Sequence, residues 1–218
     1  MRKITLIFTV LLSVVAIAQE GPLISSAVLA DRNNEIAQAK EYIDQAENAI
    51  KGKSEDDISY KNMRKFLYYK GVVYFKIATS EDEAIKALDP NALDKAKDAF
   101  DKTIEYEAKV GKESFTKDAK DKLPYIAAEY AQRGIDKANA QDFKGAYEDF
   151  LNSYKLKKGA VDTSMYFNAG LMAQNAQMYE EAIKINRELI DMGYKGTTFI
   201  ATNAETGEPI NFATKDQM

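Results

Sequence analysis

The chain of 218 residues contains no cysteine and no histidine. Without cysteine there is no disulfide, no thiol nucleophile and no attachment site for the acyl chains of a lipoprotein. Without histidine a Ser-His-Asp arrangement cannot form, and the usual zinc ligand sets are missing as well. These absences exclude most hydrolases, and they leave packing alone to stabilise the fold.

Motifs for phosphate, calcium and carboxylate chemistry are also missing or weak. The chain has no GxGxxG and no GxxxxGK[ST] sequence that could hold a nucleotide phosphate. The segment 204–209, AETGEP, has too few carboxylates for a calcium loop. The acid pairs at 56–57 and 180–181 lie in polar or first-turn helical surroundings, where solvation and the helix dipole account for them. We therefore expect no catalytic residue, no metal and no cofactor, and the chain is not predicted to be an enzyme.

The charges are nearly balanced and are mixed along the chain. The 30 lysine and arginine residues and the 34 aspartate and glutamate residues give a formal net charge of −4. Basic and acidic residues are interleaved rather than grouped in blocks, which is typical of solvated helix faces. A surface for nucleic acid would need a basic patch, so we expect no nucleic-acid partner.

Residues 1–18 have the pattern of a signal peptide. Arg2 and Lys3 form a basic start, an apolar run covers residues 4–17, and the sequence AIA at 16–18 is a small-residue cleavage site. The apolar run is shorter than the roughly 20 residues that a membrane-spanning helix needs. The alternative is a retained N-terminal anchor, which the small residues at the cleavage site disfavour. We expect an exported protein, periplasmic or secreted, with no membrane span after cleavage.

The main feature of the remaining chain is an internal repeat, in which two segments align without a gap at an offset of 36 residues. The matched pairs are Tyr130 and Tyr166, Gly134 and Gly170, Asn139 and Asn175, Phe143 and Tyr179, and Ala146 and Ala182. A period of this size is typical of stacked helical hairpins, and the matches disfavour two unrelated amphipathic hairpins. Glycine inside a helix costs about 1 kcal/mol relative to alanine, so the glycines indicate a close approach of two helices. The alanines are predicted to supply the matching small face, and the aromatic residues at 143 and 179 to cover the seam.

In each copy an aromatic residue precedes the glycine by four positions, and an aromatic-x-x-Ala pair opens the second apolar run. This pattern resembles the tetratricopeptide repeat (TPR) family in a weak form. The resemblance implies an all-α fold, a right-handed solenoid of helical hairpins in which each hairpin is stabilised by its neighbours. We predict a helical domain at 34–196 with hairpins at about 60–109, 122–158 and 162–193. A leading helix at 34–51 resembles the second half of a repeat without its first half.

The first of these hairpins contains an insertion. Gly71 follows a leucine by four positions and is the third helix-one glycine, but the spacing from it to Ala96 is 13 residues longer than the corresponding spacing in the next hairpin. The inserted sequence SEDEAIKAL at 80–88 is predicted to extend the first helix or to form a short turn of its own. Asp89 and Pro90 are then predicted to start the second helix as N-cap and first helical residue.

Glycine, proline and serine at 19–33 predict a flexible lead-in before the leading helix, for which Asn33 or Asn34 is the predicted N-cap. Pro124 is predicted to lie where the second hairpin begins, because the missing N–H of proline costs least at a helix start.

After residue 196 the sequence changes in character from helix to strand. Segment 197–218 is predicted to hold a β-hairpin, with strands at 198–202 and 209–212 about a turn at 205–207. Thr214 and Gln217 then resemble a capping box with no helix after it, so the tail is interpreted as truncated.

The resemblance also implies a binding surface, because in this family the first helices of successive hairpins line a concave groove for a peptide or a partner helix. Carried over from the three glycines, the groove positions are Lys65, Tyr68, Val72, Phe75 and Lys76 in the first hairpin, Ala128, Ala131, Ile135, Ala138 and Asn139 in the second, and Ser164, Phe167, Leu171, Gln174 and Asn175 in the third. The alternative is that Tyr68, Phe75 and Phe167 belong to the core or are covered by the N-terminal helix.

These features together predict a non-catalytic adaptor that holds another protein or peptide of the bacterial cell envelope. The alternative is a module that binds an envelope polymer such as a glycan, which the 13 tyrosines suggest.

Overall fold

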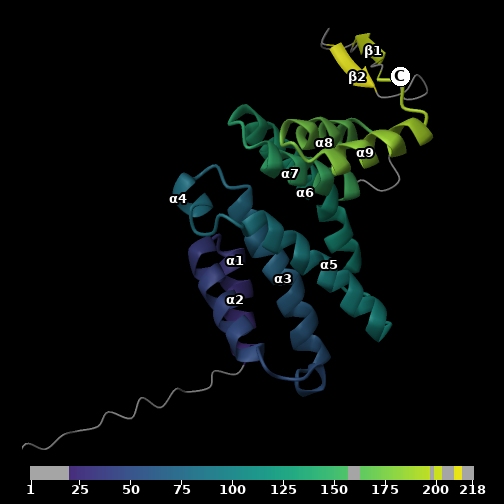
Figure 1. The fold of residues 1–218 in the computed structure, drawn as a ribbon. Helices are drawn as coiled ribbons and strands as arrows, with labels where there is room; N and C mark the ends of the chain where they lie inside the picture. The colour runs from purple at the N-terminus through teal and green to yellow at the C-terminus, as the bar shows by residue number, and fades with distance from the viewer. Residues whose placement is uncertain (1–19, 157–162, 197–198, 203–208, 213–218) are drawn as a thin grey trace, which may run out of the picture. The chain divides into compact units, whose positions relative to one another are not determined.

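The computed structural model describes residues 20–156, 163–196, 199–202 and 209–212, and the fold is all-α (Figure 1). The chain divides into two compact units, residues 1–66 and 67–218, which are described separately here. The predicted signal peptide, the predicted turn at 205–207 and the predicted capping box lie outside the described residues. Within the described ranges, no helix has the length and apolar character needed to cross a membrane.

The first unit is built on a helical hairpin of α1 (Glu20–Arg32) and α2 (Ile36–Ile50), which pack against each other. Helix α1 occupies the residues for which the sequence predicts a flexible lead-in, so that prediction is wrong. Its glycine and proline lie in the first turn, where neither breaks a helix. A buried stripe of Ile24, Ala27 and Val28 follows at helical spacing. Helix α1 is therefore the first helix of the hairpin, and the prediction that α2 lacks this partner is wrong.

The start of α2 also differs from the prediction. Its N-cap is Glu35, and no side chain caps the helix. Asn34 instead adopts a left-handed conformation with a φ of 61°. Asparagine tolerates this conformation better than most residues, which lets the chain reverse direction within a short turn. After α2 the first unit continues through the 3₁₀ turn η1 (Glu55–Asp57) to the start of α3 (Tyr60–Ala78).

The second unit contains the remaining helices. They are the part of α3 from residue 67, α4 (Glu83–Lys86), α5 (Ala92–Val110), α6 (Thr116–Asn139), α7 (Phe143–Leu156), α8 (Ser164–Asn175) and α9 (Tyr179–Asp191). From α5 to α9, each helix packs against the next one in the chain. Strands β1 (Phe199–Thr202) and β2 (Pro209–Phe212) form an antiparallel pair in which residue 199 lies opposite residue 212.

Three of the turns between helices have the same backbone geometry. A residue with positive φ lies in each turn: Asn34 between α1 and α2, Gln141 between α6 and α7, and Gln177 between α8 and α9. In each turn the N–H of that residue donates to the carbonyl three residues earlier, and the next N–H donates to the carbonyl five residues earlier. This is the Schellman motif, which glycine usually forms. The hairpin of α1 and α2 therefore shares the turn of the two aligned repeats, although no glycine marks any of these turns in the sequence.

Each helix-one glycine lies against a large side chain of its partner helix. A Cβ built on the glycine would lie 2.6 Å from Phe100 at Gly71, 3.0 Å from Phe150 at Gly134 and 2.9 Å from Ile185 at Gly170. The predicted close approach of two helices is therefore confirmed. The residue that fills the space is large, however, and not the alanine that the sequence predicts. Tyr179 is 60% exposed, so it does not cover the seam as predicted.

The inserted segment forms a short helix of its own, α4, which is the second of the two predicted possibilities. The carboxylate of Asp82 caps α4 by accepting a hydrogen bond from the N–H of Ala84 at 2.8 Å. Helix α5 then begins at Ala92, slightly later than the start predicted at Asp89 and Pro90.

Helix α6 begins at Thr116, so Pro124 lies inside the helix and not at its start as predicted. The early start follows from Glu107 in α5, whose side chain is fully buried. Its carboxylate accepts hydrogen bonds of 2.7 to 3.1 Å from the N–H groups of Ser114, Phe115 and Thr116. The first N–H groups of a helix have no partner inside the helix, and Glu107 satisfies them from the preceding helix.

The same contacts set the charge of Glu107. Burial alone would raise the pKa of its carboxyl, but the hydrogen bonds from residues 114–116 outweigh burial and hold the pKa below its ordinary value. A depressed pKa means that the ionised carboxylate stabilises the folded state above the unfolded-state pKa of about 4.3. That contribution is lost as the pH falls from there through the folded-state pKa.

Replacing Gly71 with alanine should lower the free energy of unfolding by about 1–3 kcal/mol, because the added methyl group overlaps the buried ring of Phe100. The gain in helix propensity, about 1 kcal/mol, is too small to offset this overlap. Urea denaturation of G71A, of F100L and of the double variant measures this loss in the free energy of unfolding. The loss in the double variant should be smaller than the sum of the two single losses by about 1 kcal/mol, because leucine at position 100 leaves room for the added methyl group. Additive losses would contradict the proposed contact.

The variant Glu107→Gln should lose about 2 kcal/mol of stability at pH 7, because neutral acceptors bind the α6 amides less strongly than a carboxylate does. Its stability difference from the parent protein should shrink as the pH is lowered below about 4.3. Urea midpoints measured from pH 7 to pH 3 test this. Glu105→Gln, an exposed change in the same helix, is the matched control and should show neither effect. A constant difference across this range would contradict the capping role.

Candidate functional site

Seven of the ten predicted groove residues on α6 and α8 are exposed, and Ala131, Ala138 and Ser164 are half-buried. Ile135, Phe167 and Leu171 are 43%, 39% and 42% exposed. The amide side chains at 139, 174 and 175 are exposed as well. The ring of Phe167 also contacts Tyr194, with 5.5 Å between ring centroids. These two helices therefore present apolar and amide side chains to solvent at the positions that the repeat alignment predicts.

The predicted groove residues on α3 are less exposed than those on α6 and α8. Lys65 lies in the first unit, and Tyr68, Val72, Phe75 and Lys76 of the second unit are all half-buried. The ring of Tyr68 stacks on Phe115, with centroids 4.5 Å apart and an angle of 7° between the planes. The Lys122 ammonium lies 5.7 Å from the centroid of the Phe75 ring. Within this unit, Tyr68 is therefore covered in part by Phe115, which directly precedes α6, and Phe75 in part by Lys122 of α6.

A pocket of about 280 Å³ lies elsewhere in the second unit. It is bounded by the end of α3, the inserted segment with α4, the start of α5 and one face of α6. The lining residues are Ala78, Lys86, Asp89, Pro90, Ala92, Leu93, Glu129, Gln132, Arg133 and Asp136. None of the predicted groove residues is among them.

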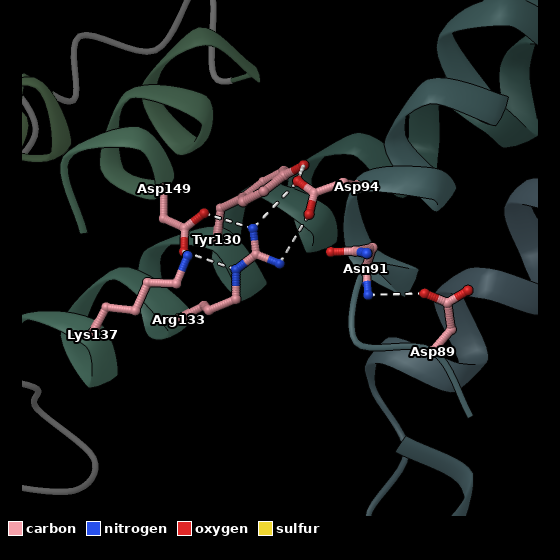
Figure 2. A network of polar contacts seen from close by, with 7 residues as sticks. All are labelled: Asp89, Asn91, Asp94, Tyr130, Arg133, Lys137 and Asp149. Atoms are coloured by element: carbon pink, nitrogen blue, oxygen red, sulfur yellow. Dashed lines mark hydrogen bonds and ion pairs between the residues drawn. The ribbon is translucent and has the colours of Figure 1, made fainter. Parts of the chain in front are cut away.

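A network of charged side chains adjoins this pocket and is centred on Arg133 of α6 (Figure 2). Its guanidinium donates to both carboxylate oxygens of Asp149 in α7 at 2.6 and 2.8 Å, and to both oxygens of Asp94 in α5 at 3.2 and 3.3 Å. Lys137 forms a second ion pair with Asp149 at 2.9 Å. The hydroxyl of Tyr130 donates to Asp94 at 2.7 Å, and the guanidinium lies 5.1 Å from the centre of the Tyr130 ring. The network therefore connects α5, α6 and α7.

The contacts shift the pKa of three groups in the network, Arg133, Tyr130 and Asp94. Burial would lower the pKa of Arg133, but Asp149 and Asp94 outweigh it and raise the pKa. Burial and then the hydrogen bond to Asp94 raise the pKa of the Tyr130 phenol. Burial would raise the pKa of Asp94, but Arg133 and Tyr130 lower it. These shifts favour a protonated Arg133, a protonated Tyr130 and an ionised Asp94, which are the charge states that the observed hydrogen bonds need.

Several polar residues that line the pocket also have partners of their own. Asp89 accepts a hydrogen bond from the N–H of Asn91 at 2.9 Å (Figure 2). It also accepts one from the Lys95 ammonium at 2.5 Å. Gln132 donates to Asp136 at 3.0 Å. Among the described residues there is no group of three acidic side chains that could hold a metal ion.

The sequence contains a signal for the network that the repeat alignment does not use. Asp149 lies on the buried face of α7, together with Ala146, Phe150 and Ser153 at helical spacing. An acidic residue at this spacing is predicted to be buried, and a buried charge needs a partner of opposite charge. The partners could not be found this way, because Arg133 and Lys137 of α6 reach Asp149 only when α6 packs on α7.

Comparison with protein-family models, with curated proteins and with solved structures finds no match for this chain.

The variant Arg133→Met should lower the free energy of unfolding by about 3 kcal/mol, because it removes the main partner of Asp149, whose side chain is 2% exposed. Asp94→Asn should cost less than about 1 kcal/mol, since the Asp94 side chain is 45% exposed. Urea denaturation of both variants measures the difference. Equal losses, or a larger loss for Asp94→Asn, would contradict the assignment of Asp149 as the buried member of the network.

Proposed function

We propose that this chain is a TPR-like solenoid of helical hairpins, and that it acts as a non-catalytic adaptor for another protein or peptide of the bacterial cell envelope. The 36-residue sequence repeat supports the solenoid. So do the three matching Schellman turns and the large side chains that pack against each helix-one glycine. Export through the segment 1–18 is part of the proposal and would place the protein in the periplasm or outside the cell.

The observation that carries the proposal is the exposed apolar surface on the first helices. Ile135 in α6 and Phe167 and Leu171 in α8 each leave about two fifths of the residue exposed, at 39 to 43%. They occupy positions that the repeat alignment assigns to one face of the array, with exposed amides beside them. Large apolar side chains gathered on one face are typical of a surface that binds a partner. Aromatic anchors such as Phe167 dominate the energetics of protein interfaces.

The polar groups of the network around Arg133 are used within the fold, which is consistent with a non-catalytic role. Arg133 is engaged by two carboxylates, and Tyr130 and Asp94 are engaged with each other. The glycan alternative rests on the number of tyrosines, but several of these support the fold. Tyr68 stacks on Phe115, and Tyr166 stacks on Tyr154 with 4.3 Å between ring centroids. These tyrosines have internal uses, which reduces the case for a carbohydrate surface.

Phe167→Ala should weaken binding of the partner by about 1–3 kcal/mol while changing folding stability by less than about 1 kcal/mol. A core position would instead lose about 3–5 kcal/mol in folding stability. The measurements are a urea midpoint and the recovery of partner from a cell-envelope extract on immobilised protein.

Two matched variants make this test selective. Phe150→Ala removes a buried ring and should lower the urea midpoint strongly. Tyr125→Ala removes a ring that is 64% exposed but lies outside the predicted groove positions, so it should retain partner binding. A large fall in the midpoint of Phe167→Ala would place that residue in the core. Retention of carbohydrate without protein would favour the glycan alternative over the adaptor.

A further inference from the structure

Helix α9 carries an apolar stripe that faces solvent. Tyr179, Ile183 and Ile190 are 60%, 51% and 71% exposed. Their spacing of four and seven residues puts them on one side of the helix. These residues differ from the apolar residues of α6 and α8 on which the adaptor proposal rests.

The internal repeat shows what covers the corresponding stripe one hairpin earlier. At the offset of 36 residues, the matching positions on α7 are Phe143, Tyr147 and Tyr154, which are partly buried and pack against the core shared by α7, α8 and α9. Tyr154 stacks on Tyr166 at the start of α8, with 4.3 Å between centroids and 13° between planes. Helix α8 is thus the element that covers α7. In the described part of the chain, no helix follows α9 to cover its stripe in the same way.

Helix α1 of the first unit carries a surface that is complementary to this stripe. The shared turn aligns Asn34 with Gln177, and therefore α1 with α8. Ala27 and Ala30 of α1 are buried, as are Gly170 and Ala173 at the same positions of α8, so contacts within the hairpin are alike. The difference appears at two further positions. Met172 of α8 is 8% exposed in the core cluster, whereas the matching Leu29 of α1 is 60% exposed. Ala169 is 0% exposed, whereas the matching Ser26 is only half-buried.

The charges at the two ends also match. Helices α7 and α8 pack against each other, and Tyr154 at the end of α7 stacks on Tyr166 at the start of α8, so the two helices run in opposite directions. A helix placed on α9 in the same way would bring its last turn to the first turn of α9. Helix α1 has Arg32 in its last turn, and α9 has Glu180 and Glu181 in its first turn. A copy of α1 therefore offers α9 an exposed apolar residue, Leu29, and a charge opposite to that of its first turn.

We propose that the chain associates with a second copy of itself, head to tail, with α1 of one copy packed on the exposed stripe of α9 of the other. The contact repeats between copies the packing of α8 on α7 within one chain. Such an interface joins two different surfaces, so each copy keeps one free end, and the association continues into short chains or closes into a ring.

Analytical ultracentrifugation tests this with protein purified in the processed form that cells make from the full sequence. The average mass should rise with concentration and fall with added salt, because Arg32 faces two carboxylates. Leu29→Glu and Ile183→Glu should each raise the dissociation constant about tenfold or more, since a charge is placed at the centre of an apolar contact. Both changed residues are exposed, so circular dichroism should show an unchanged helical content. Tyr125→Glu, an exposed aromatic change elsewhere on α6, should associate as the parent protein does.

The decisive sample is an equimolar mixture of the two variants. Leu29→Glu keeps an intact α9 surface and Ile183→Glu keeps an intact α1 surface, so the mixture should form pairs and stop there. A parent protein that stays monomeric up to about 1 mM would overturn the proposal. Association of Leu29→Glu alone would show a symmetric contact between two α9 surfaces and would overturn it too. So would a mixture that fails to pair, or association that neither substitution changes. None of these outcomes affects the partner test of Phe167.

Discussion

The hairpins of the second unit depend on a close contact between a glycine in one helix and a large side chain in the next. Gly71, Gly134 and Gly170 each leave a space in the surface of the first helix, and a ring or a branched side chain of the second helix fills it. The contact fixes the position of one helix along the axis of the other, because the large side chain fits only opposite the glycine. The cost of glycine inside a helix, about 1 kcal/mol, is offset by the packing of these buried side chains.

Two buried carboxylates then specify how successive helices meet. Glu107 of α5 binds the free N–H groups at the start of α6, and Asp149 of α7 binds Arg133 and Lys137 of α6. Apolar packing between helices tolerates several arrangements, whereas a buried carboxylate needs its donors at hydrogen-bond distance. The charged contacts thus select one arrangement among those that the apolar faces permit. Breaking them leaves a buried charge without its partners, which folded proteins rarely tolerate.

The surfaces that remain open have two different origins. Ile135, Phe167 and Leu171 lie on first helices, at positions that a TPR-like array would use for a partner. The stripe on α9 and the exposed Leu29 on α1 have another origin: α1 and α9 are the first and the last helix among the described residues. In an array each hairpin buries its neighbour, so the ends are apolar unless a polar cap or another molecule covers them. Partner binding and self-association can therefore use separate surfaces of one chain.

The sequence by itself determined the helical class, the 36-residue repeat and the places where two helices approach closely. These features follow from the local periodicity of apolar residues and from the alignment of a few residues such as Gly134 and Gly170. It did not reveal α1, whose glycine and proline resemble a flexible segment when read alone, nor the Schellman turns formed without glycine. Only the tertiary structure decided the start of α6, the partners of Asp149 and the exposure of the predicted groove residues. Each of these depends on residues that are far apart in the chain and meet only when the hairpins pack.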